Sequence, residues 1–544
     1  MNRLRFFLFT FLIISLQVSW AQKRKIIPPE KPKLIITIVV EQMRYDMIYR
    51  YWDRFEDNGI KRLLNEGTFC KNAHYNYLFT QSSVGYATIA TGTYPSYHGI
   101  VADQWYNNVK EEIIYCAEDL KAVPTNYLSD VGSRSPRQML TTTFADEMKL
   151  FNVNKSKSIG ISMKDYAAIF PAGHKADASY WFDSKSGVWL SSNFYMDSLP
   201  DWVMEFNNKK HTDLYLSRTW ETKYPIESYL FSDVDAYADG LYDQFQFPYE
   251  LSKLRKKEKG YSLLAKTPYG NTLTKDFAIS AILHEGLGDD EITDFLSISF
   301  TATSEVYKLF GPGSVELEDV YLRLDEEIAH LLTFIDDTYA KEEVLVVFTS
   351  DHGSVLVPEF LKENKIPAGY FNYKKALYLL NSYLNLTYGR GEWVKLYHKQ
   401  QIYLNHVLIE SSKLNLADFQ QTVADFLIQF AGVANTVTAS TMQKTQYNKG
   451  VYSKMQNSFN QNRSGDVLIH LEPGWIEEKS VIESENSAYS YDTHVPLIFY
   501  GWKIGRKTVD RRIDIIDIAP TITYFLEISE PNGCMGEVIY ELVD

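Results

Sequence analysis

One short stretch constrains this chain more than any other, because an apolar run in it ends abruptly in polar residues. The run Val344–Thr349 is followed, after Ser350, by Asp351, His352 and Gly353. A continuous β-branched run is typical of a parallel strand buried on both faces, and ligands bind beyond the carboxyl ends of such strands. One carboxylate beside one imidazole suits zinc or manganese better than calcium. The other interpretation is a capping Asp followed by a surface His.

A second stretch has the same design. Leu34–Val40 is an apolar run, and a carboxylate, Glu41, follows it at once. A helix is predicted over about 45–66, where Gly67 stops it, and this makes a strand-helix unit. Glu41 therefore stands at the end of its strand as Asp351 does at the end of its own.

A third stretch, Thr80–Gly92, is hydroxylic at its front and apolar with helical spacing behind. It predicts a helix that begins among hydroxyl groups. The N-terminus of a helix offers free N–H groups and the positive end of the dipole, which stabilise an alkoxide and accommodate a phosphate. An ordinary Ser or Thr N-cap is the other interpretation.

Composition excludes some classes of function. Of the 544 residues, 45% are hydrophobic and 23% charged, as in ordinary globular proteins long enough for two or more lobes. The net charge of −14 argues against broad binding to nucleic acid or anionic membranes, since either needs a basic face. Three scattered cysteines are too few for a disulfide framework or a zinc knuckle.

The N-terminus has the pattern of an export signal. Arg3 and Arg5 precede an apolar run over 6–16, and small residues surround Trp20 before Gln22. The pattern predicts a cleavable signal peptide over residues 1–21 and a periplasmic or secreted protein. An uncleaved membrane anchor is the other interpretation. No later stretch reaches about 18 apolar residues, so no transmembrane segment is expected in the mature chain.

Several motifs along the chain resemble those of one enzyme family. Tyr94–Ile100, just after the hydroxylic stretch, resembles the signature behind the nucleophile of the alkaline phosphatase superfamily. The resemblance is to the nucleotide pyrophosphatase/phosphodiesterase-like branch, and within it to the PafA-type bacterial alkaline phosphatases. Further stretches that resemble this group are Ser162–Asp165, Pro171–His174, Tyr321–Asp325, Ser464–Val467, Tyr491–Leu497 and Asp517–Thr521.

The resemblance implies a fold and a reaction. The fold is α/β, a central mostly parallel sheet with helices on both faces, over residues 33–544. Two regions are expected as insertions, a cap at about 177–290 and a second at about 371–465. The resemblance also implies two zinc ions at the strand ends and a Ser or Thr that attacks phosphorus. Two metals suit this reaction because one activates the nucleophile and the other stabilises the leaving oxygen.

Of the two metal positions that the resemblance implies, the one beside the nucleophile is better preserved. Asp351 and His352 match ligands of the family, and Glu41 stands where the family has the shorter Asp. Ser82 stands at the position of the nucleophile, where PafA-type relatives usually have Thr. A Ser hydroxyl is chemically competent for this role.

The second metal position is eroded. Ser304 stands where a ligand Asp is expected, and Lys308 stands where a ligand His is expected. Only His494 keeps the residue type of a ligand. One imidazole does not hold zinc tightly where three protein ligands are the norm, so one zinc or manganese ion is expected instead of two.

Two substrate contacts also differ from the family. Asp103 stands at the place of a phosphate-binding Asn, and Tyr166 stands where the phosphomonoesterases have Arg, whereas Lys164 is retained. Without Arg, the bidentate fork for a terminal phosphate is lost. Lys308 has two interpretations: its ammonium replaces the charge of the missing metal next to Ser82, or it remains from an abandoned site.

Two hypotheses follow. The first is an exported metal-dependent hydrolase that acts on a small phosphate or sulfate ester through Ser82 and a reduced, single-metal site. The second is a catalytically inactive relative, a pseudoenzyme that serves as a binding or assembly module for a protein partner in the cell envelope.

Overall fold

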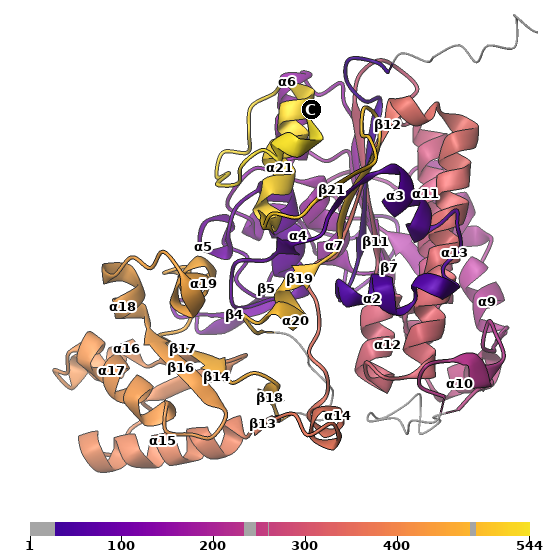
Figure 1. Cartoon of the computed structure of the whole chain (residues 1–544). Coiled ribbons are helices and arrows are strands. Elements are labelled where there is room, and N and C mark those ends of the chain that lie inside the picture. The colour runs from indigo at the N-terminus through magenta and orange to yellow at the C-terminus, as the bar shows by residue number, and fades with distance from the viewer. Residues whose placement is uncertain (1–27, 233–245, 259, 479–485, 544) are drawn as a thin grey trace, which may run out of the picture.

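The fold is built on one large mixed sheet in the middle of Figure 1. The computed structural model describes residues 28–232, 246–258, 260–478 and 486–543. Across the sheet the nine strands follow the order β21, β2, β20, β12, β1, β11, β6, β7, β8. Their bounds are β1 (Leu34–Val40), β2 (Thr68–Cys70), β6 (Ser158–Ser162), β7 (Ala178–Asp183), β8 (Val188–Leu190), β11 (Asp294–Phe300), β12 (Val344–Thr349), β20 (Leu497–Gly501) and β21 (Lys507–Val509).

The five strands from β12 to β7 run parallel, and β20 and β8 flank them in the antiparallel direction. Every residue of β1 and β12 is buried, as the two apolar runs predicted. The predicted α/β fold with a central mostly parallel sheet is confirmed. Its consequence for function is that β1, β6, β11 and β12 all end at the same edge.

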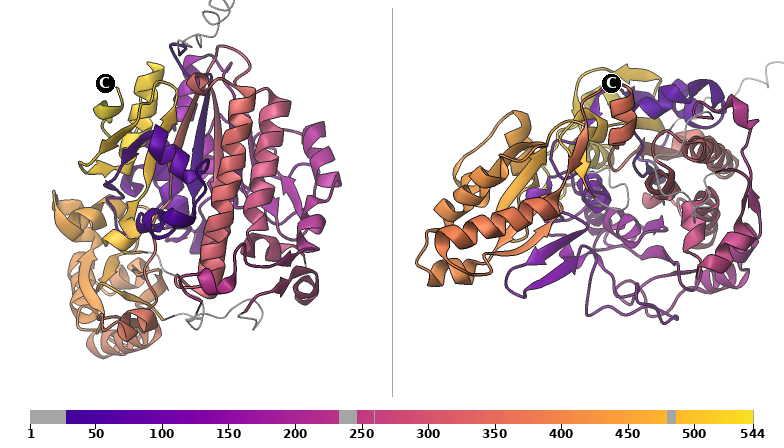
Figure 2. Two further views of the ribbon diagram at one scale, coloured as in Figure 1. Left: turned by 45° about the vertical axis from the view of Figure 1, so that its right-hand side comes forward. Right: turned by 90° about the horizontal axis from the view of Figure 1, so that it is seen from below.

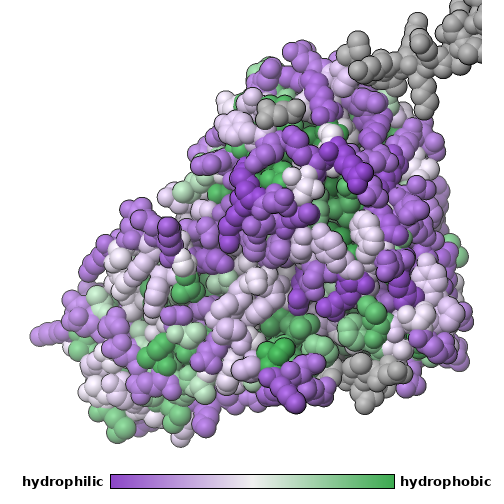
Figure 3. All heavy atoms as spheres, in the orientation of Figure 1, coloured by the Kyte–Doolittle hydropathy of each residue, from purple (hydrophilic) through white to green (hydrophobic). Residues whose placement is uncertain are grey.

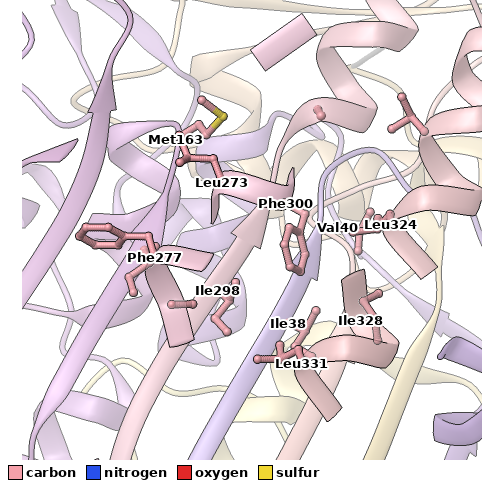
Figure 4. Packing of buried hydrophobic residues seen from close by; sticks show 14 of the residues in the cluster. Ile38, Val40, Met163, Leu273, Phe277, Ile298, Phe300, Leu324, Ile328 and Leu331 are labelled. Carbon is pink, nitrogen blue, oxygen red and sulfur yellow. The ribbon is translucent and has the colours of Figure 1, made fainter. Parts of the chain in front are cut away.

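Alternate side chains of β1 enter two different cores on the two faces of the sheet. Ile38 and Val40 lie on one face beside Ile298 and Phe300 of β11, whereas Val39 belongs to the core on the other face. Figure 4 shows the helix residues that close over the first core, which are Leu273, Phe277, Leu324, Ile328 and Leu331. Full burial of one such side chain contributes about 1.5–3 kcal/mol.

Helices cover both faces of the sheet, as Figure 2 shows from two further directions. The helices associated with the first core include α2 (Asp46–Arg50), α3 (Ile60–Glu66), α11 (Tyr269–Glu285), α12 (Ala302–Phe310) and α13 (Val315–Thr338). Those of the second core are α4 (Ser82–Thr91), α6 (Phe144–Phe151), α7 (Asp165–Ala172) and α21 (Ile518–Leu526).

The helix predicted over 45–66 is broken into α2, a short 3-10 turn and α3. A buried carboxylate from α13 causes the break: Asp325 accepts the backbone N–H of Glu56 at 2.6 Å and that of Ile60 at 2.7 Å. The chain leaves the helical path to present these two N–H groups. The predicted end is right, since Gly67 follows the last residue of α3.

The region predicted as a cap, about 177–290, is only partly an insertion. β7 and β8 belong to the central sheet, and α11 packs against β11. β7 is rich in aromatic residues and lacks the β-branched run that marks β1 and β12, and the cap boundary stays a prediction. The elements between these core parts are α8 (Asp201–Asn208), α9 (His211–Leu216), β9 (Thr219–Trp220), β10 (Tyr249–Glu250) and α10 (Leu251–Leu254).

The second inserted region forms a small lobe at the lower left of Figure 1. Its four-stranded sheet has the order β14, β15, β17, β16, and it has a hydrophobic core of its own. The last strand of this sheet ends at Leu471, so the lobe extends a few residues beyond the predicted range of 371–465. Its elements are α15 (Tyr373–Tyr388), β14 (Val394–His398), β15 (Gln401–Leu404), α16 (His406–Ser411), α17 (Leu416–Leu427), β16 (Val433–Thr438), α18 (Ala439–Lys444), α19 (Gly450–Ser458) and β17 (Val467–Leu471).

Short elements connect these parts. They are β3 (Ala73–His74), α5 (Pro95–His98), β4 (Gln104–Asn107), β5 (Glu112–Tyr115), α14 (Pro358–Glu363), β13 (Gly369–Phe371), β18 (Trp475–Glu477), α20 (Ser490–Thr493), β19 (His494–Val495) and β22 (Ile513–Asp514). β3, β19 and β22 form a small sheet, and β4 and β5 form a hairpin.

The predicted signal peptide, residues 1–21, lies outside the described residues. Within the described part, no helix combines the length and apolarity that a membrane crossing needs. The three cysteines are all free. The face in Figure 3 is mainly hydrophilic, with hydrophobic residues in small separate groups.

The first turns of α13 carry buried carboxylates that bind side chains of other elements. The Tyr249 hydroxyl donates to Glu316 at 2.5 Å, and Arg54 pairs with Glu318 at 2.6 Å. Burial raises the pKa of Glu316 to about 7. The folded protein thus favours the neutral form of this carboxyl, and a charge there is unfavourable.

The substitution Glu316→Gln should stabilise the protein at pH 8 and have little effect at pH 4. Because the pKa of Glu316 is raised in the folded state, the neutral carboxyl contributes fully to the stability of the parent below its ordinary pKa near 4.3. This contribution is lost as the pH rises toward 7. We expect a gain of about 2 kcal/mol in the free energy of unfolding at pH 8. Thermal melts at both pH values measure it, with Asp337→Asn at an exposed position of α13 as the control. An equal effect at both pH values would contradict the interpretation.

Candidate active site

Segments far apart in the sequence meet at one edge of the central sheet. Glu41 directly follows β1, Lys164 comes two residues after β6, and Asp351 and His352 come shortly after β12. α12 begins at the same edge, just after β11. These strands are parallel neighbours, so the side chains at their carboxyl ends converge.

The Asp351–His352 pair is fully buried and held in one orientation. Asp351 Oδ1 accepts the N–H of Gln42 and that of His352, both at 2.8 Å. His352 Nδ1 lies 2.7 Å from the carbonyl oxygen of Gly353. A carbonyl can only accept, so Nδ1 carries the proton and Nε2 is left as an acceptor. A Cβ on Gly353 would lie 2.1 Å from the carbonyl oxygen of Tyr491, which explains the glycine.

Ser82 is the first residue of the buried helix α4, and its Oγ lies 3.3 Å from His352 Nε2. The helix N-terminus adds unsatisfied N–H groups and the positive end of the dipole. Close packing of α4 makes this geometry possible, since a Cβ on Gly85 would lie 2.1 Å from the carbonyl oxygen of Asp351. The structure thus brings the predicted nucleophile together with a predicted ligand.

Glu41 is fully buried, and its two oxygens have different surroundings. Oε2 accepts from Lys164 Nζ at 2.6 Å and from Ser304 Oγ at 2.5 Å. Within the described part of the chain, Oε1 has no hydrogen-bond partner. Burial raises the pKa of Glu41 to about 7; Lys164 acts to lower it and the nearby Asp351 acts to raise it. Glu41 therefore needs cationic neighbours to stay charged.

Alternating charges run outward from Glu41. Lys164 Nζ also lies 3.0 Å from Glu305 Oε1, and Lys308 Nζ lies 3.6 Å from the same oxygen. Burial acts to lower the pKa of Lys164, but the two carboxylates outweigh it and the pKa is raised. Burial acts to raise the pKa of Glu305, but the lysines hold it at about 2. Among the described residues, Lys308 forms an ion pair with Glu305 and no hydrogen bond with Ser82.

The predicted ligands of the first metal position offer buried donor atoms but are not gathered into a ready site. Asp351 Oδ2, like Glu41 Oε1, is buried without a hydrogen-bond partner among the described residues, and it lies 3.6 Å from His352 Nε2. Two carboxylate oxygens and one imidazole nitrogen are the usual protein ligands of a catalytic zinc. The described residues contain no ready group of three His, Cys, Asp or Glu that could hold an ion, and Lys164 and Ser304 hold Glu41 instead. The number and identity of the ion stay predictions.

His494 is placed apart from these residues. Its ring stacks between those of Tyr45 and His74, at centroid distances of 4.1 and 4.4 Å. Its Nε2 lies 2.8 Å from the carbonyl oxygen of Lys71, to which it donates. In the described part, no hydrogen bond, ion pair or ring contact joins His494 to the other predicted ligands. The predicted second metal position thus has neither Ser304 nor Lys308 as a suitable ligand, and His494 supports the small sheet.

Residues that the sequence analysis did not select stand beside the nucleophile. Gln81, next to Ser82, donates to Asn486 Oδ1 at 2.8 Å. Gln81 Oε1 accepts the N–H of Asp103 at 2.8 Å and the ammonium of Lys399 at 3.2 Å. Gln, Asn and Lys are common residue types without a spacing signal, and only the position of Gln81 beside Ser82 could have drawn attention to it.

Asp103 lies at the N-terminus of α4. Its Oδ1 accepts the backbone N–H of Ser83 at 3.3 Å, and its Oδ2 lies 3.8 Å from Lys399 Nζ. Tyr166 is nearly buried near the start of α7, and burial raises its pKa. Asp103 thus accepts an N–H that an anionic ligand at this helix end would use.

A cavity of about 400 Å³ lies beside the chain of charges. Its lining includes the charged residues Lys164, Glu305 and Lys308 and the aromatic residues Tyr115, Tyr166, Trp181 and Phe182. Apolar walls with a few convergent polar groups are typical of small-molecule sites. The cavity is large enough for the alcohol part of an ester.

A family model agrees with this geometry. The model described as "Type I phosphodiesterase / nucleotide pyrophosphatase" matches residues 35–491, a range that includes every segment of the site. The chain belongs to this family. The resemblance to the alkaline phosphatase superfamily is thereby confirmed.

Relatives of this phosphodiesterase family match almost the whole chain. Alkaline phosphatase PafA of Elizabethkingia meningoseptica is 35% identical, over 96% of this chain and 96% of its own. Alkaline phosphatase PhoV of Synechococcus elongatus is 35% identical, over 94% and 93%. A protein of Myroides odoratus named calcium-transporting ATPase is 38% identical, over 95% of both. A crystal structure of wild-type PafA superposes with a TM-score of 0.89 at 34% identity, over 96% of this chain and 100% of that one.

Purified protein should bind about one zinc or manganese ion per chain. Added zinc should then raise the melting temperature of the parent and should not raise that of Asp351→Asn, because ligand binding stabilises only a protein that has the site. Elemental analysis and thermal melts measure both effects, with Glu410→Gln on the exposed face of α16 as the control. Two tightly held zinc ions would contradict the assignment of Ser304 and Lys308, and a protein that no metal stabilises would favour the inactive relative.

Proposed function

We propose that the chain is an exported hydrolase of phosphoric or sulfuric esters, with Ser82 as its nucleophile and a reduced, single-metal site. One observation carries the proposal: Ser82 Oγ lies 3.3 Å from His352 Nε2, at the N-terminus of a buried helix and among buried carboxylates. A hydroxyl, an imidazole and a helix end in this arrangement suit attack on an anionic ester.

Four charged or ionisable side chains around Ser82 have distinct roles in this proposed reaction. His352 donates from Nδ1 to the carbonyl of Gly353, which fixes the tautomer and leaves the lone pair of Nε2, 3.3 Å from Ser82 Oγ, as the atom that would coordinate the ion. Glu41, Asp351 and His352 would hold the ion, and a bound zinc or manganese would lower the pKa of the Ser82 hydroxyl. Lys164 keeps Glu41 charged and adds positive charge beside the reacting centre.

Binding of the ester depends on the N-terminus of α4. The N–H of Ser83 and the helix dipole favour a phosphoryl or sulfuryl oxygen there. Asp103 now accepts that N–H, so a highly charged ester meets more repulsion than a singly charged one. The cavity lined by Lys164 and Tyr166 receives the alcohol part in this proposal.

A second candidate function has its own support. In the catalytically inactive relative, the site persists only as a charge network while the fold binds a protein partner in the cell envelope. The observation in favour is that Lys308 pairs with Glu305 at 3.6 Å and does not reach Ser82. Lys164 is likewise occupied by Glu41 and Glu305.

Export belongs to the proposal as well. It rests on the signal-peptide pattern of residues 1–21. A periplasmic or secreted location also suits an enzyme whose small ester substrates come from outside the cell.

The substitution Ser82→Ala should abolish turnover, with a loss of roughly 10³-fold or more in kcat, while the protein stays folded. The reason is that the only atom removed is the attacking oxygen. Steady-state assays with a panel of phosphate and sulfate esters measure the loss, and thermal melts check folding. Ser217→Ala, at an exposed position between α9 and β9, is the control. Unchanged turnover in Ser82→Ala would place the reaction elsewhere.

Monoanionic diesters and sulfate esters should be hydrolysed better than phosphate monoesters. Tyr166 cannot supply the bidentate contacts of Arg, and Asp103 repels a second negative charge. The comparison of kcat/KM across matched aryl esters tests this preference. Turnover of a simple phosphate monoester at about 10⁴ M⁻¹s⁻¹ or above would contradict it.

A further inference from the structure

A second cavity lies between the small lobe and the core, where α19 packs beside α5 (Figure 1). Its volume is about 650 Å³, within the range of about 300–1,000 Å³ that is usual for small-molecule sites. Met535, near the C-terminus, contributes to its wall. Among the described residues, none that the candidate active site contains lines this cavity, so it is separate from the cavity beside Lys164 and Glu305.

The wall of this second cavity is polar but carries no charge. More than half of its described lining residues are Asn or Gln, and the described lining contains no Asp, Glu, Lys or Arg, although 23% of the residues of the chain are charged. Arg463, close to the cavity in sequence, is engaged elsewhere: it donates to the carbonyl oxygens of Gly99 and Gln138, and its guanidinium lies over the ring of Trp105. The cavity therefore offers an ionic ligand no charged partner.

Hydrogen bonds fix the less exposed amides of the cavity. Asn460 is nearly buried and donates to the carbonyl oxygen of Ser96 at 3.0 Å, and Asn457 donates to that of Asn76 at 2.7 Å. Both bonds connect the small lobe to the core. Gln456 of α19 makes three hydrogen bonds to the backbone of α18 and of the segment that follows it. The shape of the cavity is therefore set before a ligand arrives.

The amides at the rim are open to a ligand. Gln443, Gln446 and Gln461 are exposed, and within the described part of the chain their side chains form no hydrogen bond. An amide group donates through its nitrogen and accepts through its oxygen. A sugar hydroxyl also donates and accepts, so one amide matches a pair of neighbouring hydroxyl groups. A simple anion or cation would use only half of this capacity.

An exposed aromatic ring completes the wall. Tyr97, on α5, is 55% exposed, and among the described residues its ring packs against no other ring. The face of an aromatic ring carries partial negative charge and attracts groups with partial positive charge. The C–H groups on one face of a sugar ring are such groups. A free ring beside several amides is therefore suited to a polyhydroxylated ligand that has an apolar face.

We propose that this cavity binds neutral carbohydrate: the amides of the rim bind hydroxyl groups, and the ring of Tyr97 packs on the face of a sugar ring. An uncharged peptide is the competing ligand, because its backbone also donates and accepts. Peptides gain specificity from pockets for their side chains, however, and the described lining contains no Leu, Ile or Val to form apolar ones. The inference goes beyond the proposed function and does not depend on Ser82. Such a site holds the protein on a neutral sugar polymer.

The test measures binding of four neutral probes, maltohexaose, cellohexaose, laminarihexaose and xylohexaose, to the purified protein by calorimetry. At least one probe should bind to the parent. Tyr97→Ala should weaken this binding roughly tenfold, as expected for the loss of one aromatic packing contact. Tyr97→Phe, which keeps the ring, should retain most of the affinity. Tyr378→Ala is the matched control, because Tyr378 is 73% exposed on α15 and does not line the cavity.

The uncharged wall gives two further readouts. Gln461→Ala should weaken binding roughly twofold to tenfold, the usual effect of losing a neutral hydrogen bond. The affinity of the parent should be the same in about 0.05 M and about 0.5 M salt, because screening acts only on charges. Melting temperatures establish that each variant is folded. Gln421→Ala, at an exposed position of α17, is the control for the loss of an amide.

Several results would overturn the proposal. They are no binding of any probe to the parent with a Kd below about 10 mM, equal binding by Tyr97→Ala, binding that salt abolishes, and tighter binding of an uncharged Gly-Ser peptide than of any sugar. Ser82→Ala should bind the sugar as the parent does. A parent that hydrolyses esters and binds no sugar contradicts this inference alone, and one that binds sugar and hydrolyses no ester contradicts the proposed function alone.

Discussion

The ion pair between Glu41 and Lys164 is the interaction on which the candidate site depends. A carboxylate that is fully buried is costly unless a cation stands beside it, and Lys164 supplies one at 2.6 Å. The two oxygens of Glu41 have different surroundings. Oε2 accepts from Lys164 and Ser304, whereas Oε1 has no hydrogen-bond partner among the described residues. Lys164 and Ser304 therefore balance the charge of Glu41 on one side of the carboxylate only.

Much of the core could be predicted from the sequence, because central parallel strands have a local signal. The runs before Glu41 and Asp351 are buried on both faces, as is typical of β-branched runs in the interior of a parallel sheet. The break in the helix over 45–66 could not be predicted, since Asp325 causes it from far along the chain. The place of β7 in the sheet is hidden for a related reason: this aromatic strand pairs with β6 and has no β-branched pattern of its own.

The same distinction applies to the candidate site. Ser82, Asp351 and His352 belong to short motifs, and the structure brings them together as their placement at strand and helix ends suggested. Lys399 and Asn486 meet Gln81 across 318 and 405 positions of sequence, and no local spacing encodes such contacts. His494 was expected as a ligand from its motif, and its ring packs between Tyr45 and His74, so its role as a ligand stays a prediction.

The replacements in the second metal position form a consistent charge pattern. Ser304 removes a negative charge next to Glu41 and donates a hydrogen bond to it, while Lys308 adds a positive charge beside Glu305. An Asp at 304 would place a carboxylate close to Glu41 Oε2, where two buried like charges repel strongly. Restoring that one ligand would therefore disturb the Glu41–Lys164 pair before it could rebuild a metal site, so Ser304, Lys308 and Lys164 act as one unit.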